Sequence, residues 1–379
     1  MNFLEDAFVQ KYKEGNTVCG DFYVAERHSR GSIFVVCDGI GSGVYANIAA
    51  ITCAERIMEL FRLGMSVRDI SETVAASMHR ARTEDIPFSA FVAAIVFPDG
   101  RFLAYNYENP APILIRAGRA AALEPMVYGA GLELIGEMSG SLEEGDVLLL
   151  FSDGVSQAGL GYGYDMGVGT AFVADFITAE LSKGVLARDV PERILEMCES
   201  VSGGAFRDDT SLVSLSSRRA RELTLLTGPP SRRALDKAYA EEFMEMPGKK
   251  ILCGSTTIEI VARELHKEVE SLIGNSMGEP PEYLVDDVDL ATEGAVTLNQ
   301  AYNILDEPVE NLSKQSMVER FCLLLHEADV IHLMIGKANN LAHTDLIFKQ
   351  VGVRIRMTAI RLIADKLRAM GKLVIARYY

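Results

Sequence analysis

Apolar residues in the first part of the chain form short β-rich runs and longer segments at helical spacing. Residues 31–37 read Gly-Ser-Ile-Phe-Val-Val-Cys and end at Asp38-Gly39, which predicts a strand that stops at an acid. After a glycine-rich turn, residues 44–63 and 67–82 carry apolar side chains at the spacing of amphipathic helices. The pattern therefore predicts a strand followed by a helical pair.

Hairpins dominate the next stretch. Strands are predicted over residues 89–97 and 101–106, joined by the turn sequence Pro-Asp-Gly-Arg. A buried strand over 146–151 again ends near an Asp-Gly pair. Helices over 169–181 and 188–198 and a closing strand over 210–216 complete this part. Consecutive hairpins between helical pairs indicate an α+β sandwich and not alternating β-α units.

A short basic stretch at residues 216–221 marks a predicted boundary, so we expect a domain over 1–217 and a smaller α/β domain over 222–379. The second part begins with predicted strands over 223–227 and 250–253, the latter leading through Gly-Ser-Thr-Thr into a helix expected to reach Leu272. Further helices and strands are predicted over 298–305, 316–327, 330–335, 355–370 and 373–378.

Composition and charge exclude several functions. The chain has 379 residues and a net charge of -16, which argues against a general nucleic-acid binder. We see no signal peptide and no apolar run long enough to cross a membrane, so we expect a cytoplasmic protein without a membrane partner. The six cysteines have no C-x-x-C spacing, which predicts buried free thiols and no zinc site.

Acidic residues provide the candidate chemistry. Asp21, Asp38, Asp153 and the pair Asp208-Asp209 are each expected where a strand ends, at the rim of a sheet. Carboxylates that converge there would repel one another unless a cation held them, and Mg²⁺ and Mn²⁺ prefer such oxygen ligands. A single Asp-Gly is usually only a turn, and we assign no chemistry to Asp99-Gly100.

The ordered motifs resemble a known family. Gly-Asp, then Asp-Gly-Ile-Gly-Ser-Gly, Asn-Pro-Ala-Pro, Glu-Gly-Asp-Val-Leu-Leu-Leu-Phe-Ser-Asp-Gly-Val and Asp-Asp-Thr-Ser-Leu are similar to the SpoIIE-type branch of the metal-dependent protein phosphatases (PPM). The resemblance covers roughly residues 1 to 217. It implies an αββα sandwich with two divalent cations, Mn²⁺ or Mg²⁺, at one end of the sheets.

The resemblance also implies a role for each acid. Asp38 would bridge both cations, and Gly39 would bind the second one through its carbonyl. Asp153 and Asp208 would complete the first cation, so that Asp38, Asp153 and Asp208 are the predicted catalytic residues. Asp21 would lie near the metals through water. Asp209 belongs to the predicted metal set, although anchoring of the loop after Asp208 is the preferred interpretation of its role.

This sequence departs from the family pattern at two points. Ile40 stands where better-known eukaryotic members carry a histidine that donates a proton. No clear counterpart exists for the arginine with which those relatives grip phosphate. Lys11, Lys13 and Arg27 are the candidates, and surface charge is the alternative interpretation of each.

The leading hypothesis is a protein serine/threonine phosphatase in which two cations activate a water to hydrolyse phosphoserine or phosphothreonine. The resemblance implies a phosphorylated regulatory protein as substrate, such as an anti-sigma-factor antagonist. The alternatives are a regulatory protein that acts mainly through its C-terminal domain, and a small-molecule phosphatase. The sequence is compatible with an oligomer and does not reveal the oligomeric state.

One local feature stands out in the second domain. Gly254 to Thr257 join a predicted strand to a predicted helix, and a helix start of this kind can bind an anion. The stretch lacks the lysine of a P-loop. Simple capping by Ser or Thr is the alternative interpretation, and a phosphate-bearing or acidic ligand is the functional one.

Overall fold

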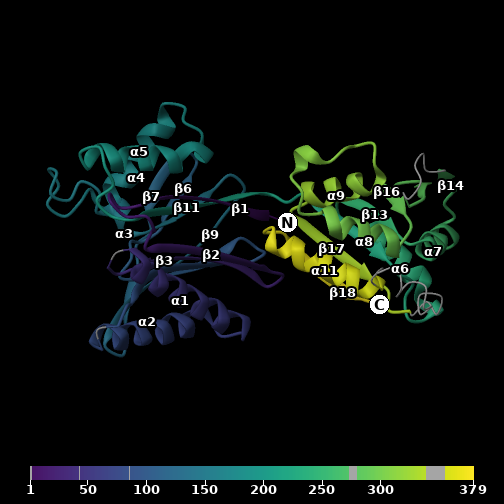
Figure 1. Cartoon of the computed structure of the whole chain (residues 1–379), viewed down its shortest axis with the longest axis horizontal. Coiled ribbons are helices and arrows are strands. Elements are labelled where there is room, and N and C mark those ends of the chain that lie inside the picture. The colour runs from purple at the N-terminus through teal and green to yellow at the C-terminus, as the bar shows by residue number, and fades with distance from the viewer. Residues whose placement is uncertain (1, 42, 85, 273–279, 339–354) are drawn as a thin grey trace. The chain divides into compact units, whose positions relative to one another are not determined.

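The computed structural model describes the whole chain except residues 1, 42, 85, 273–279 and 339–354. The chain divides into two compact units, residues 1–26 with 30–219, and residues 220–379 with 27–29. Figure 1 labels the elements of both. Each unit has its own sheets and its own core, and each is described by itself.

The first unit contains two antiparallel sheets. Six strands form one sheet in the order β2-β3-β4-β5-β9-β8, and five form the other in the order β1-β11-β10-β6-β7. The strands of the six-stranded sheet are β2 (Asp21–His28), β3 (Gly31–Gly39), β4 (Ser89–Val96), β5 (Arg101–Tyr107), β9 (Glu133–Ser141) and β8 (Met126–Ala130). Those of the five-stranded sheet are β1 (Asn2–Lys11), β11 (Thr210–Arg219), β10 (Val147–Phe151), β6 (Ile113–Arg116) and β7 (Arg119–Ala122).

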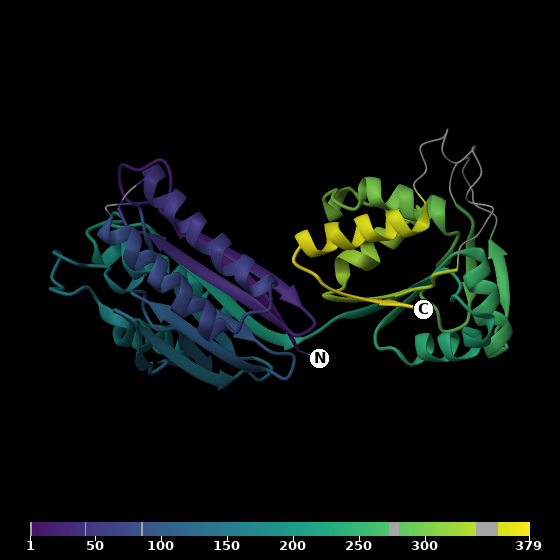
Figure 2. The ribbon, with the colours of Figure 1, turned by 90° about the horizontal axis from the view of Figure 1, so that it is seen from below.

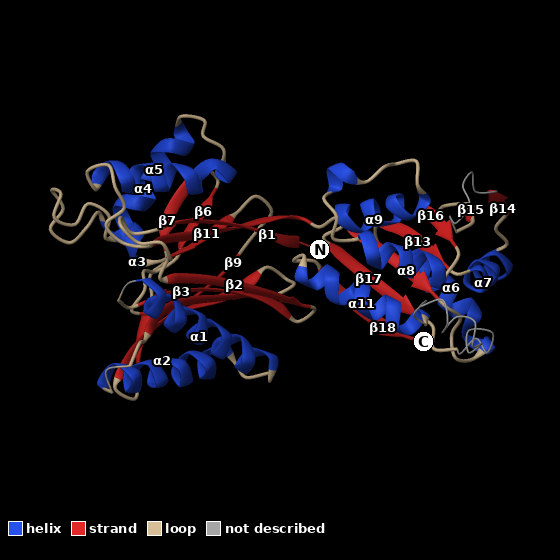
Figure 3. Ribbon diagram, viewed as in Figure 1, coloured by secondary structure: helices blue, strands red, loops and turns tan. Residues whose placement is uncertain are grey.

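Helices cover the outer face of each sheet, which completes an αββα sandwich (Figure 3). Helices α1 (Gly43–Arg62) and α2 (Val67–Thr83) pack on the six-stranded sheet, and α4 (Gly169–Ser182) and α5 (Val190–Val201) pack on the other. The short α3 (Asp153–Ser156) follows β10, and a 3-10 turn, η1 (Ala187–Asp189), precedes α5.

The apolar run in β3 is continuous because both faces of its sheet are buried. Phe34 and Val36 enter the core between the two sheets, whereas Ile33 and Val35 pack against α1 and α2. A strand buried on both sides loses the apolar-polar alternation of a half-exposed strand. The same holds for β10, whose five residues are all buried. The α+β fold class predicted from the sequence is confirmed.

The second unit is a smaller α/β unit with one seven-stranded sheet in the order β14-β15-β16-β13-β12-β17-β18. Strands β16, β13, β12, β17 and β18 are parallel, and β14 and β15 form an antiparallel edge. The strands are β12 (Glu222–Thr227), β13 (Lys249–Cys253), β14 (Val269–Leu272), β15 (Glu282–Val285), β16 (Leu290–Thr292), β17 (Val330–Ile335) and β18 (Leu373–Tyr378).

Helices lie on both faces of this sheet, as in doubly wound α/β folds. One core joins the sheet to α8 (Ala295–Ile304), α9 (Met317–Glu327) and α11 (Arg356–Ala369), and another joins it to α6 (Asp236–Glu245) and α7 (Ser255–Leu265). The 3-10 turns η2 (Arg233–Leu235) and η3 (Val309–Asn311) lie in the connections. Figure 2 shows the unit from a second side.

One predicted helix is wrong at its C-terminal end. The helix expected to reach Leu272 ends at Leu265, and His266 then adopts a left-handed conformation with φ of 52°. Residues Val269–Leu272 form β14 instead, paired with β15. Pairing with a distant strand supplies hydrogen bonds that local periodicity does not reveal.

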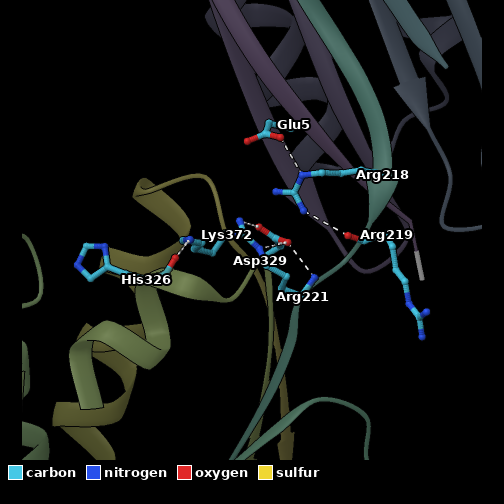
Figure 4. Close-up of polar contacts among 7 residues, drawn as sticks. All are labelled: Glu5, Arg218, Arg219, Arg221, His326, Asp329 and Lys372. Carbon is cyan, nitrogen blue, oxygen red and sulfur yellow. Dashed lines mark hydrogen bonds and ion pairs between the residues drawn. The ribbon is translucent and has the colours of Figure 1, made fainter. Parts of the chain in front are cut away.

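Ion pairs and hydrogen bonds secure each unit near residue 220, where one unit gives way to the next in sequence (Figure 4). In the first unit, the Arg218 guanidinium lies 2.8 Å from a Glu5 carboxylate oxygen. In the second, Asp329 accepts hydrogen bonds from the main-chain N–H of Arg221 at 2.8 Å and from its guanidinium at 2.9 Å. Because Asp329 is buried, this charge-assisted pair holds the start of β12 firmly beside the start of β17.

Two further expectations concern the cysteines and membrane-spanning helices. All six cysteines are buried and unpaired, as predicted. In the described part of the chain, no helix combines the length and the apolar character that crossing a membrane requires.

Candidate metal centre

Antiparallel pairing brings the predicted acids to one end of the sandwich. Asp38 lies near the end of β3, and Asp153 follows the end of β10. The expectation that every acid follows a strand is wrong for three of them, because Asp21 is the first residue of β2 and the pair Asp208-Asp209 precedes β11. In antiparallel sheets the end of one strand lies beside the start of the next, so both positions reach the same rim.

Asp38 interacts electrostatically with three of the other acids. Burial raises the pKa of Asp38 well above its usual range, and the carboxylates of Asp21, Asp153 and Asp208 raise it further. Its main-chain carbonyl accepts a hydrogen bond from the Ser89 hydroxyl at 2.8 Å, which holds the end of β3 against β4. Like charges close together disfavour ionisation, so this rim gains from a bound positive charge.

Asp21 is a buried acid at the start of β2. Only 3% of its surface is exposed, and neither carboxylate oxygen has a hydrogen-bond partner among the described residues. Burial raises the pKa of Asp21 to about 6; the hydroxyls of Ser152 and Ser211 oppose this rise, and the Asp209 carboxylate adds to it. A buried carboxylate without partners is costly unless a cation or a proton neutralises it.

Asp153 and Asp208 face the solvent side of the cluster. Burial raises the pKa of Asp153, its contact with Asp38 opposes the rise, and Asp208 adds to it. The Gln157 amide donates to Asp153 Oδ2 at 2.5 Å and fixes its orientation. Lys13 Nζ lies 3.6 Å from Asp208 Oδ1, so a cationic side chain also borders the cluster.

Asp209 makes a different set of contacts from its neighbour Asp208. Its Oδ1 accepts from the main-chain N–H of Lys13, and its Oδ2 accepts from that of Gly20, each at 2.8 Å. The side chain is 6% exposed. Both oxygens are therefore occupied by main-chain amides of the β1–β2 connection, which Asp209 ties to the start of β11.

The glycines after two of the acids allow close packing of main chains. A Cβ on Gly39 would overlap the main chain of Ala46 in α1, and a Cβ on Gly154 would overlap the Asp209 carbonyl. At Gly20, a Cβ would lie 2.9 Å from Asp209 Oδ2. Glycine at these positions lets α1 and the residues before β11 approach the rim closely enough to bring the acids together.

A pocket of about 80 Å³ adjoins Asp208. Gln157, Phe206 and Arg207 are among the residues that line it. The Arg207 guanidinium stacks on the Tyr162 ring, 4.8 Å from its centroid, and pairs with Glu14. Space for a small polar group is thus present beside the cluster.

The donor set fits hard divalent cations. The four acids supply only carboxylate oxygens, and the orphaned carboxylate of Asp21 and the raised pKa of Asp38 both indicate missing positive charge. In the part of the chain that the structure describes, no three His, Cys, Asp or Glu side chains are close enough to hold an ion.

Sequence reasoning missed several polar side chains at the rim. Ser152 and Ser211 flank Asp21, and the Ser211 main-chain N–H donates to the Ser152 hydroxyl at 3.0 Å. Gln157 lies one helical turn beyond Asp153. No sequence signal separates them from ordinary strand-end and helix residues. Of the basic candidates, Lys13 lies beside an acid of the cluster.

Comparison with known proteins identifies the family. The family model of Stage II sporulation protein E (SpoIIE) matches residues 28–218, half of the chain. The chain belongs to this family. No curated protein is similar enough to be recognised as a relative.

Several solved structures are similar to part of the chain. The RsbU and RsbW domains of a Mycobacterium tuberculosis protein share 19% identity over 64% of this chain and 69% of that one, with a TM-score of 0.49. The phosphatase domain of Bacillus subtilis SpoIIE with a regulatory fragment shares 17% identity over 57% of this chain, with a TM-score of 0.48. The match spans 62% of that protein, less than two thirds.

A crystal structure of RsbX with magnesium shares 18% identity over 57% of this chain and 100% of that one, with a TM-score of 0.42. TM-scores below 0.5 do not identify a fold. The assignment of the sandwich therefore rests on the strand order, the two helical layers and the family match.

Proposed function

We propose that the first unit hydrolyses phosphoserine and phosphothreonine on a regulatory protein, with divalent cations held by its aspartates. The observation that carries this proposal is the electrostatic cluster of Asp21, Asp38, Asp153 and Asp208 on one rim of a SpoIIE-family fold. Carboxylates from four separate parts of the chain would destabilise the fold there if nothing offset their charge.

The proposed ligands follow from this arrangement. Asp38 interacts with each of the other three acids, which suits a carboxylate shared between two cations. Asp153 and Asp208 would complete one cation, the Gly39 carbonyl would reach the second, and Asp21 would act through water. Mn²⁺ or Mg²⁺, when bound, would supply a more acidic water and charge that offsets the phosphate.

The chain's own residues then bind and orient the substrate. Lys13 carries a cation at the rim and is our candidate for contact with a phosphate oxygen. Asp209 holds the Lys13 main chain in place. Gln157 keeps the Asp153 carboxylate oriented toward the cluster. Phosphate monoesters react very slowly without help, so positioning and charge provide most of the assistance.

The proposal also covers the substrate and the roles of the two domains. We propose a phosphorylated regulatory protein as substrate, in line with the SpoIIE-family match. Residues 1–217 would act as the phosphatase domain. Residues 222–379 would bind a partner or a ligand.

Hydrolysis of a phosphoserine peptide by the full chain tests the proposal. We expect activity with Mn²⁺ or Mg²⁺, loss of activity in excess chelator, and a loss of about 10³-fold in Asp38→Asn because one negative charge of the cation site is removed. Nucleotides and sugar phosphates should be poorer substrates than the peptide if the protein assignment is correct.

Asp99→Asn is the matched control. Asp99 also precedes a glycine at the end of a strand, but it lies on the β4–β5 turn and bonds Arg101 Nε at 2.6 Å. This variant should keep full activity. Unchanged hydrolysis in excess chelator, or an Asp38→Asn variant as active as Asp99→Asn, would exclude the metal mechanism.

A further inference from the structure

Helix α7 of the second unit begins at a glycine. It follows β13 directly; its N-cap residue, Gly254, has no side chain with which to cap the helix, and the first turn contains no acidic residue. Gly254 has φ of 123°, a conformation that side chains rarely adopt. The first N–H groups of a helix have no partner within the helix, and they lie at the positive end of its dipole.

A buried hydroxyl faces this helix start. Thr257, the third residue of α7, is 1% exposed, and its Oγ1 has no hydrogen-bond partner in the described part of the chain. The same atom lies 3.1 Å from the position that a Cβ on Gly254 would take. An unpaired buried hydroxyl is unfavourable, and a ligand that accepts its hydrogen bond would remove this cost.

The start of helix α8 is built in the same way, but its polar groups have hydrogen-bond partners. It also follows a strand and a glycine, Gly294. The Glu293 carboxylate accepts from the Val296 N–H at 2.9 Å, and Thr297, the third residue of α8, shares a 2.9 Å hydrogen bond with the Thr292 hydroxyl. The helix start of α7 therefore differs from its counterpart in lacking both an acid and a partner for its threonine.

The main chains of the two helix starts lie close together. Strands β13 and β16 are adjacent, and the Gly254 N–H donates to the Thr292 carbonyl at 2.7 Å. A Cβ on Gly294 would lie 3.3 Å from the Gly254 Cα, so the two glycines pack closely against each other. Ser255 and Thr256 at the start of α7 are exposed, at the carboxyl edge of the sheet, where α/β folds bind ligands.

Two more groups on this edge favour an anion. Thr227 ends β12 in register with Cys253 of β13, and its buried Oγ1 also lacks a partner among the described residues. The Arg356 guanidinium donates to the Thr227 carbonyl at 2.9 Å and to the Gly336 carbonyl at 2.7 Å. Among the described residues no carboxylate pairs with Arg356.

We propose that the N-terminus of α7, with the Thr257 hydroxyl, binds the phosphate group of a small phosphorylated molecule. The free main-chain amides of Ser255 and Thr256 would donate to the phosphate oxygens, and Thr257 would add a third donor. A dianion at this position also meets the positive end of the helix, and Arg356 lies near enough to act electrostatically on the adjacent Cys253. The site lies wholly within the second unit and requires no metal.

Calorimetric titration of the full chain with inorganic phosphate, and separately with adenosine monophosphate, tests this site. Excess chelator throughout removes metal-dependent binding by the first unit, so the result is independent of the phosphatase proposal. We expect saturable binding, and about tenfold weaker binding in Thr257→Val, which loses one charge-assisted hydrogen bond but keeps its shape. Equal affinities would assign the site to phosphate alone, and tighter nucleotide binding would extend it to the nucleoside.

Thr297→Val is the matched control, because it removes the hydroxyl at the same position of α8. It should bind phosphate like the unmodified chain, yet be less stable in urea because it breaks the bond to Thr292. Thr257→Val should be at least as stable as the unmodified chain, because no described residue hydrogen-bonds its hydroxyl. The proposal is overturned if neither probe binds at millimolar concentration, or if Thr257→Val binds as tightly as Thr297→Val.

Discussion

Asp209 offers a direct test of how the rim is held together. Its carboxylate accepts two main-chain hydrogen bonds of 2.8 Å, from Lys13 and from Gly20, at a position that is 6% exposed. A hydrogen bond to a charged group contributes about 1.5–3 kcal/mol, so Asp209→Ala should lower the free energy of unfolding of the first unit by about 3–5 kcal/mol. Asp209→Asn keeps one acceptor and should lose about 2 kcal/mol.

Urea unfolding in excess chelator measures this loss, with circular dichroism as the probe because the chain contains no tryptophan. Hydrogen exchange localises it: amides of residues 12–20 should exchange faster in both variants while those of β3 and β10 stay protected. The chelator matters because Asp209 was also among the predicted metal ligands. Unchanged stability and exchange without metal, together with a raised Mn²⁺ requirement for hydrolysis, would refute the anchoring role and favour a ligand.

Three further variants address packing, pH and substrate binding. Gly154→Ala should destabilise the first unit by roughly 2–3 kcal/mol, because its Cβ would overlap main chain that cannot yield, whereas Gly129→Ala, with open space around it, should be neutral in the same urea experiment. The pKa of Asp21 is about 6 in the folded chain, which is above its value in the unfolded chain. Between about pH 4 and 6 the folded chain therefore binds more protons than the unfolded chain does. The metal-free chain should therefore gain up to about 3 kcal/mol as pH falls through this range, and Asp21→Asn should remove that gain. Lys13→Met should leave stability within about 0.5 kcal/mol, since its pair with Asp208 is exposed, but raise KM for a phosphoserine peptide; an unchanged KM would exclude phosphate contact.

The sequence by itself determined most elements of the first unit. The apolar run before Asp38 and the helical spacing after it predicted β3, α1 and α2 close to their observed bounds. Such segments are long and strongly periodic, and burial on one face or on both leaves a clear pattern. Strands β1, β2, β8 and β9 were not predicted; in β8 and β9, exposed residues such as Met126 and Leu134 blur the alternation. The predicted end of α7 was wrong for a related reason, because the pairing of β14 with β15 determines where the helix stops.

Only the tertiary structure determined which contacts each acid makes. Asp208 and Asp209 are adjacent and chemically identical in sequence, yet one borders Lys13 Nζ in solvent and the other binds two buried amides. The starts of β2 and β11 reach the rim because neighbouring strands of an antiparallel sheet run in opposite directions. Local sequence does not reveal which strands become neighbours. The two threonines at the starts of α7 and α8 make the same point, since one hydroxyl has a partner and the other has none among the residues that the structure describes. Hydrogen-bond partners come from distant segments, so a residue's role depends on where folding places those segments.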